Sequence, residues 1–312
     1  MVLFAIFCIQ FIAFAQEPAD YVNPFIGTSN YGATFPGPIA PRGMASISPF
    51  NVAGALNKLE KDSQWLSNPY VHENTFLTGF SQVNLSGVGC PDLGVLLLMP
   101  TTGELETNHL KYGSTYKNEV AKAGYYSTHI DKYDIKAEFT ASKRVGVSKF
   151  TFPNGQANVL LNLGLGLTNE QGAMVQVVSS TEIQGMRSVG TFCYNSPEAA
   201  YPVYFVAKFS KPADRFGVWK KPAKYEGTEA QWMAYNGKNR LMEQSTKMVV
   251  GDSIGSYFSY NFEKTETVEV KIGVSYVSIE NARENLEKET GNKSFDAVCK
   301  ETYNEWNELL SK

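Results

Sequence analysis

Alternating apolar and polar side chains dominate the middle of the chain, which is the pattern of strands that bury one face of a sheet. In the clearest run, every second residue from Val268 to Tyr276 is apolar, and Glu269, Lys271 and Ser275 stand between them. Many short strands without long intervening helices predict an all-β fold, an antiparallel β-sandwich, over residues 16–277. Further strands, separated by turn sequences such as Pro153-Asn154-Gly155, are predicted at Tyr126–Ile130, Ile135–Ala141, Val147–Phe152, Val159–Leu163 and Val203–Phe209.

The periodicity changes to that of helices over residues 278–312. Ser278 is suited to cap a helix that Gly291 would end, and Ser294 is suited to cap a second one. We expect the apolar side of the second helix to pack on the sandwich or on a domain outside this sequence. The residues on the inner sides of the two helices are Ala282 and Leu286, and then Phe295, Val298, Thr302, Trp306 and Leu309, with Leu310 beside them.

Residues 2–15 form an apolar leader. They contain one polar residue, Gln10, and end in Ala13-Phe14-Ala15, the small-residue pattern that precedes signal-peptide cleavage. A membrane-spanning helix needs about 20 apolar residues, so a permanent anchor is the weaker interpretation. We therefore predict a signal peptide over residues 1–15, export to the periplasm, cell surface or exterior, and no membrane span after cleavage.

Composition limits the classes of function. The 312 residues include 28 basic and 31 acidic side chains, and a net charge of -3 offers no positive field to gather nucleic acid. Apolar residues make up 43%, which is too many for a disordered protein. Cleavage would remove Cys8 and leave Cys90, Cys193 and Cys299, an odd number. We therefore expect no disulfide scaffold, and we expect Cys193 and Cys299 to be small buried hydrophobic residues.

Familiar catalytic motifs are missing from the sequence. Gly164-Leu165-Gly166 lacks the third glycine of a dinucleotide-binding fingerprint, and Ser86 lacks the leading glycine of a nucleophile elbow. The three histidines, His72, His109 and His129, lack metal-ligand spacing. We interpret them as surface or singly hydrogen-bonded side chains.

Two segments are richer in glycine, proline and small polar residues than a scaffold requires, at 23–44 and 79–94. In the second, glycines would let the backbone approach a ligand, and Trp65 upstream would supply an aromatic platform for a sugar ring. A purely structural turn is the alternative interpretation. The side chains that could bond sugar hydroxyls are Gln82, Asn84, Ser86 and Asp92.

At these residues the chain resembles the N-terminal domain of glycoside hydrolase family 92, the exo-acting α-mannosidases. Four blocks match in order and span nearly the whole chain, which makes the resemblance specific. The blocks are Tyr21–Thr28; Phe35–Gly37 with Pro41–Met44; Leu85–Gly94 with Met99-Pro100; and Gly124–Ser127 with Ala137–Ala141, Arg144–Gly146 and Phe150–Pro153.

The resemblance implies a sandwich of the galactose-mutarotase type, then linking helices at residues 278–312, then a larger (α/α)₆ barrel. Members of the family invert configuration and depend on calcium, and both of their catalytic carboxylates come from the barrel. Inversion needs two carboxyl groups about 6.5–9.5 Å apart with a water between them. We therefore expect no catalytic residue here, and the resemblance assigns no metal ligand to this chain.

The resemblance also implies roles for individual residues. Trp65 would stack on a sugar, and the backbone at Gly87, Gly89 and Cys90 would approach it closely. The predicted polar contacts are Gln82, Asn84 and Asp92, although Asp92 could instead be a turn carboxylate bonded to nearby N–H groups. This chain departs from many members, which have two histidines at the positions of Gln82 and Asn84, and threonine at the positions of Val83 and Val88.

Our leading hypothesis is that the chain is the substrate-shaping N-terminal domain of a secreted, calcium-dependent, inverting α-mannosidase that acts on mannose-containing glycans. It would be inactive alone, because general acid–base catalysis supplies about 10²–10⁴-fold and its carboxylates would lie in the absent barrel. A free-standing carbohydrate-binding module is the alternative. A third hypothesis places a self-contained hydrolytic site at Asp92, Glu104 or Asp131.

Overall fold

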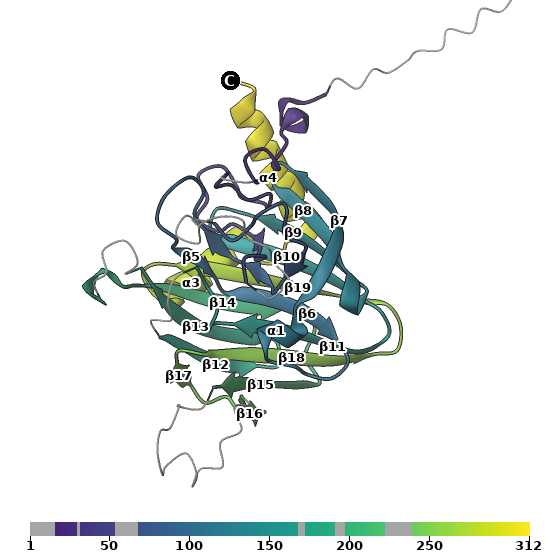
Figure 1. Cartoon of the computed structure of the whole chain (residues 1–312), viewed down its shortest axis with the longest axis vertical. Helices are drawn as coiled ribbons and strands as arrows, with labels where there is room; N and C mark the ends of the chain where they lie inside the picture. The colour runs from purple at the N-terminus through teal and green to yellow at the C-terminus, as the bar shows by residue number, and fades with distance from the viewer. Residues whose placement is uncertain (1–15, 30–31, 54–67, 168–171, 191–196, 222–238) are drawn as a thin grey trace, which may run out of the picture.

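Two antiparallel sheets form the body of the protein (Figure 1). The computed structural model describes residues 16–29, 32–53, 68–167, 172–190, 197–221 and 239–312. Within these residues, one sheet has seven strands, in the order β1 (Ser48–Pro49), β3 (Phe80–Ser81), β6 (Leu97–Thr102), β11 (Gly155–Asn162), β18 (Ile254–Phe262), β15 (Arg215–Lys220) and β16 (Arg240–Glu243).

The other sheet has ten strands in the described part of the chain, and a small ribbon pairs β4 (Val83–Asn84) with β5 (Leu93–Val95). The order in the larger sheet is β17 (Val249–Gly251), β12 (Ala173–Ser179), β13 (Glu182–Val189), β14 (Tyr201–Phe209), β19 (Glu266–Ser275), β10 (Val145–Phe152), β9 (Ile135–Ala141), β8 (Tyr125–Ile130), β7 (Ser114–Lys122) and β2 (Phe76–Leu77). The helices are α1 (His109–Tyr112), α3 (Ile279–Glu289) and α4 (Phe295–Leu310), with 3₁₀ turns η1 (Pro18–Tyr21), η3 (Asp131–Tyr133) and η4 (Pro197–Ala199).

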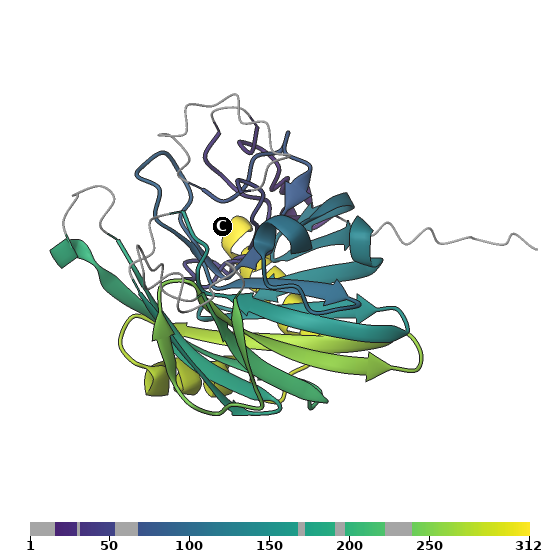
Figure 2. The ribbon, with the colours of Figure 1, turned by 60° about the horizontal axis from the view of Figure 1, so that its bottom comes forward.

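The sheets pack face to face (Figure 2). Aromatic rings meet between them. Phe209 of β14 stacks on Phe258 of β18 with ring centroids 4.0 Å apart. Phe80 of β3 lies 4.3 Å from Phe139 of β9 by the same measure. Such pairs contribute about 0.5–1.5 kcal/mol beyond the area they bury, so the interface between the sheets is a true core. The predicted antiparallel β-sandwich is confirmed.

The predicted strands are confirmed with changes at their ends. Alternate residues of β19 are buried from Val268 to Val274, whereas Tyr276 lies beyond the strand and is 40% exposed. β9 has the predicted bounds, and β11 starts earlier than predicted, at Gly155. Gly155 and Gln156 lack the apolar pattern but still pair with β18, because backbone hydrogen bonds need no apolar side chain.

Helices α3 and α4 cover the outer face of the ten-stranded sheet. Both predicted caps form, because the Ser278 hydroxyl accepts from Asn281 N and the Ser294 hydroxyl accepts from Ala297 N. The start of β10 is therefore buried on both faces, which explains why its polar alternation is incomplete. The outer core comprises Val145, Val147, Val206, Ala282, Leu286, Phe295 and Val298.

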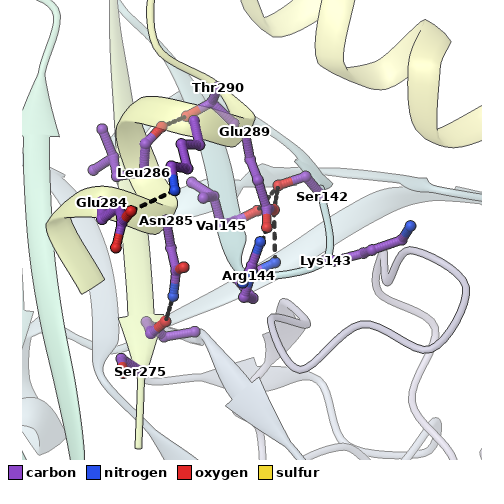
Figure 3. Close-up of polar contacts among 12 residues, drawn as sticks. Ser142, Lys143, Arg144, Val145, Ser275, Glu284, Asn285, Leu286, Glu289 and Thr290 are labelled. Carbon is purple, nitrogen blue, oxygen red and sulfur yellow. Dashed lines mark hydrogen bonds and ion pairs between the residues drawn. The ribbon is translucent and has the colours of Figure 1, made fainter. Parts of the chain in front are cut away.

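Glu289, at the end of α3, holds the helix to the turn between β9 and β10 (Figure 3). Its carboxylate accepts from the Ser142 hydroxyl at 2.6 Å and from the Arg144 backbone N–H at 2.9 Å, and it pairs with the Arg144 guanidinium. The same turn is bonded on its other side, where the Lys143 carbonyl accepts from Met44 N at 2.7 Å. One tight turn thus joins the helices to the Pro41–Met44 block.

The first described residues pack against α4, as the purple and yellow segments show (Figure 1). The Trp306 indole donates to the Ile39 carbonyl at 2.6 Å, and the Tyr303 hydroxyl donates to Asp20 at 2.8 Å. Trp306 is half-buried by the chain's own residues, whereas Leu310 stays 42% exposed. We expected the apolar side of α4 to pack either on the sandwich or on a domain outside this sequence. At Trp306 it packs on the sandwich domain.

The predicted signal peptide, residues 1–15, lies outside the described residues. Among the helices that the structure describes, none combines the length and the apolar character needed to cross a membrane.

Candidate functional site

The segment 79–94 folds into β3, β4 and β5 and a loop between the last two strands. The loop is exposed: Leu85 is 44% and Val88 is 78% accessible. Gly87 has a φ of +105°, in the region that favours glycine, and its N–H donates to the Ala33 carbonyl at 2.6 Å. No atom lies within 4 Å of a Cβ built on Gly87 or Gly89. The backbone at these two predicted positions is therefore open to an approaching ligand.

Asn84 anchors the loop from below. Its amide donates to the Ser46 carbonyl at 2.8 Å, and its side-chain oxygen accepts from the Ser81 hydroxyl at 2.6 Å. Its backbone N–H also donates to the Ser46 hydroxyl. Asn84 is 9% exposed, so these protein contacts occupy most of its hydrogen-bonding capacity.

Gln82 faces the core. It is fully buried, and its Nε2 donates to the Phe80 carbonyl at 3.0 Å. A Cβ added to Gly146 would lie 2.6 Å from Gln82 Oε1, so the missing side chain of Gly146 leaves the room that the amide fills. In this structure the Gln82 side chain lies under the loop and does not reach the surface.

Asp92 connects the loop to the ends of β13 and β14. Oδ1 accepts from Leu93 N at 2.8 Å and from Gly190 N at 3.1 Å, and Oδ2 accepts from the Tyr201 hydroxyl at 2.9 Å. Burial and the Asp92 charge raise the pKa of Tyr201, which keeps the hydroxyl protonated as a donor. These contacts are those of the turn carboxylate that was the alternative prediction for Asp92.

The backbone next to Asp92 is strained. Leu93 has a φ of +60° and Gly94 a φ of +63°, and a non-glycine residue in this region costs about 1–3 kcal/mol. The Asp92 carboxylate bonds the Leu93 N–H and so helps to hold this conformation.

Cys90, predicted to offer backbone that approaches the sugar, also forms a disulfide. It is half-buried, and its disulfide partner lies outside the described residues. We expected no disulfide framework because three cysteines cannot all pair, but an odd count leaves room for one bond. Cys299 is a free thiol, half-buried, and burial raises its pKa. Trp65, the predicted stacking platform, and Cys193 lie outside the described residues.

The candidates for a self-contained hydrolytic site belong to separate parts of the fold. Asp92 is bonded at the ends of β13 and β14, whereas Asp131 pairs with Lys117 of β7 at 2.7 Å. Glu104 is exposed in the turn after β6. The contacts of these described residues do not join any two of the three carboxylates around a water-sized gap.

A cavity of about 680 Å³ lies beside α1 and the end of β11. Its wall is mainly polar, and none of the described residues predicted for the site lines it. The wall includes Asn108, Asn162, Lys221, Asn239 and Ser253, with Leu105, Leu165 and Trp219 as its apolar part.

The described residues offer no carboxylate cluster for a calcium ion. Calcium takes six to eight oxygen ligands, and no group of three or more His, Cys, Asp or Glu side chains in the described part could hold a metal ion. Asp92, the carboxylate nearest the loop, already accepts from three protein donors. We derive no step of a reaction through calcium from this chain.

Sequence reasoning missed a carboxylate enclosed by tyrosines. Glu119 of β7 accepts from the Tyr126 hydroxyl at 2.7 Å and from the Tyr70 hydroxyl at 3.0 Å. In the sequence, Glu119 stands among the exposed polar residues of a strand, so no local pattern marks it. Only the pairing of β7 with β8 turns it toward the tyrosines.

Comparisons with known proteins agree with this fold. The model of the glycosyl hydrolase family 92 N-terminal domain matches residues 21–275, and the chain therefore belongs to this family. An uncharacterized secreted glycosidase of Arthroderma benhamiae is 25% identical over 327 residues, which cover 95% of this chain and 39% of that protein.

Solved structures give the same assignment. A family 92 α-mannosidase of Bacteroides thetaiotaomicron, in complex with mannoimidazole, has a TM-score of 0.77 and 28% identity, covering 94% of this chain and 37% of its own. The family 92 glycosyl hydrolase ccman5 has a TM-score of 0.77 and 26% identity, covering 95% and 37%. This chain thus spans less than two fifths of the length of these relatives.

Proposed function

We propose that this chain is the substrate-shaping N-terminal domain of an exported α-mannosidase that acts on mannose-containing glycans. The observation that carries the proposal is the exposed Leu85–Gly89 loop, which lies within the matched family domain and offers open backbone at Gly87 and Gly89. A relative of the same family is an α-mannosidase that was solved in complex with mannoimidazole. The relatives' chains continue well beyond the matched part, which supports a following catalytic domain.

The positions of the carboxylates indicate which domain supplies the catalytic groups and which supplies the sugar-binding surface. Inversion needs an acid and a base across a water, and the three candidate carboxylates, Asp92, Glu104 and Asp131, are exposed or bound to protein donors. We therefore assign the acid and the base of the inverting reaction to the (α/α)₆ barrel. The sandwich contributes a wall for the sugar next to the bond that is cleaved. Export, through a signal peptide at residues 1–15, agrees with the secreted relative.

Hydrolysis of an aryl α-mannoside by purified residues 16–312 tests the proposal. We expect no rate above that of buffer, because this proposal places the general acid and the general base in the barrel. We also expect methyl α-mannoside to shift the NMR signals of residues 85–89 with weak affinity. Hydrolysis by the pure chain would contradict the proposal, and so would a mannoside that leaves the loop signals unchanged.

The same titration decides the alternative function. A free-standing carbohydrate-binding module would bind mannosides tightly without any barrel, whereas a domain that forms part of an interface would bind weakly. Saturation at micromolar mannoside would favour the module.

A further inference from the structure

A hydrogen-bonded chain links an exposed histidine to the enclosed carboxylate of Glu119. The Tyr126 and Tyr70 hydroxyls both donate to Glu119, and the Tyr70 oxygen lies 3.3 Å from His72 Nδ1. His72 itself is exposed. The order of the chain, from surface to interior, is therefore His72, Tyr70, Glu119 and Tyr126.

A β-bulge places the carboxylate in this chain. The pairing of β7 with β8 shifts by one residue between Lys117 and Val120, and Asn118 has a left-handed φ of +56°. Regular alternation from the buried Tyr116 would direct Asn118 inward and Glu119 outward. The bulge reverses this order. Bulges are common next to functional sites, where they redirect a side chain.

The hydrogen bonds determine which ring nitrogen of His72 carries the proton when the imidazole is neutral. The single hydroxyl proton of Tyr70 goes to the carboxylate, so the Tyr70 oxygen can only accept from His72. A neutral imidazole here must carry its proton on Nδ1, which leaves Nε2 as an acceptor. Within the described part of the chain, Nε2 makes no hydrogen bond. The titratable groups that face Glu119 are Tyr70, Tyr116, Tyr126 and His72.

His72 is connected to the loop of the candidate site. Its backbone N–H donates to the Thr28 carbonyl at 3.0 Å, and the Phe25 ring meets the imidazole edge-on at 5.8 Å. The segment that follows Phe25 is bonded back through Thr34 to Gly27, and the neighbouring Ala33 carbonyl accepts from Gly87. His72 and Gly87 thus flank the same segment.

We propose that His72 is a further ligand-facing residue, which accepts a hydrogen bond from a sugar hydroxyl at Nε2. Glu119 and Tyr70 are positioning residues that set its tautomer, and Phe25 supplies an apolar surface beside it. The nature of the ligand rests on the proposed function. The positioning of the imidazole does not.

The tautomer is tested by ¹⁵N NMR of the histidines in residues 16–312. We expect His72 to be protonated on Nδ1 when neutral. Tyr70→Phe, which removes the acceptor, and Glu119→Leu, which leaves the Tyr70 proton free to turn toward His72, should each move it toward the Nε2-protonated form. His129 is an internal reference with the opposite tautomer, because its Nε2 lies 3.3 Å from Asp134. A His72 that is already protonated on Nε2, or that is insensitive to both substitutions, would overturn the positioning role.

The ligand is tested by titration with methyl α-mannoside. We expect the His72 Nε2 signal to shift, and His72→Phe to weaken binding by about 3- to 10-fold, the effect of losing one neutral hydrogen bond. His129→Gln should leave the affinity unchanged. If the loop signals shift but those of His72 do not, this inference fails and the proposed function stands. If the tautomer result holds but mannoside shifts no protein signal, the assignment of a sugar ligand fails both for the proposed function and for this inference.

Discussion

At the scale of single residues, the polar side chains of the candidate site divide into those that hold the loop and those that face solvent. Asn84 and Asp92 form their hydrogen bonds with backbone and hydroxyl groups of the protein. The exposed part of the loop, Leu85–Gly89, carries one polar side chain, Ser86, and is otherwise glycine and aliphatic. A ligand at this loop would therefore meet mainly main-chain atoms, while side chains beneath the loop fix their positions.

Asp92→Ala should lower the free energy of unfolding by about 2–3 kcal/mol, because it leaves the Leu93 and Gly190 N–H groups without their charged acceptor. Urea denaturation measures this change. Tyr201→Phe, which removes only one of the donors to Asp92, should cost less. A fully stable Asp92→Ala variant would argue against the structural role.

As pH rises, the substitutions Glu119→Gln and Glu138→Gln should change the free energy of unfolding, relative to wild type, in opposite directions. Burial raises the pKa of Glu119, although its tyrosine hydrogen bonds partly oppose this. The folded protein therefore binds this proton more tightly than the unfolded chain, and wild-type stability is lost as pH rises from the ordinary carboxyl pKa to the raised one. Relative to wild type, Glu119→Gln should gain stability over that interval.

Glu138 serves as the control. Burial acts to raise its pKa, but Lys136, Tyr125 and Lys149 outweigh burial and lower it. Its stabilisation is present above the ordinary carboxyl pKa and is lost as pH falls through the lowered one. Glu138→Gln should therefore lose stability relative to wild type as pH rises. Urea unfolding at a series of pH values measures both, and parallel curves for the two variants would contradict the assignment.

At the scale of elements, the turn between β9 and β10 is the point where the C-terminal helices meet the rest of the fold. Glu289 is well covered by its partners, whereas Glu287 pairs with Lys208 on the surface of the same helix. The two glutamates look alike in the sequence, because both are carboxylates near the end of α3. Their burial separates them.

Glu289→Ala should lower the free energy of unfolding by about 2–3 kcal/mol, since it leaves Arg144 N and Ser142 without their acceptor. Glu287→Ala, the matched control, should cost no more than about 1 kcal/mol, as exposed ion pairs do. Equal effects of the two substitutions in urea denaturation would contradict this account.

Gly273 sets how closely α3 approaches β19. A Cβ at this position would lie 2.4 Å from the Ala282 carbonyl oxygen, so Gly273→Ala must push the helix outward. We expect a loss of about 1–3 kcal/mol, the usual cost of overpacking. Gly89→Ala, where no atom lies within 4 Å, is the control for stability, and thermal unfolding compares the two.

At the scale of the whole molecule, the sequence predicts the architecture well because side-chain alternation and helix caps are local signals. The strands, both helices and their capping serines follow from such signals. The site was harder to predict, because the roles of Gln82, Asn84 and Glu119 depend on partners far along the chain. Glu119 faces inward only because of a bulge, and Gln82 is buried only because Gly146 leaves room for it.

The contacts between the two ends of the described chain can form only late in its synthesis. Ala19 N donates to the side chain of Asn307, 288 residues later. At about 5–20 residues per second, a ribosome needs roughly 15–60 s to make the chain between these two residues. During that time residues 17–20 lack their contacts with α4, so they stay available to other partners such as chaperones. Only when α4 emerges can the leading segment be locked in place.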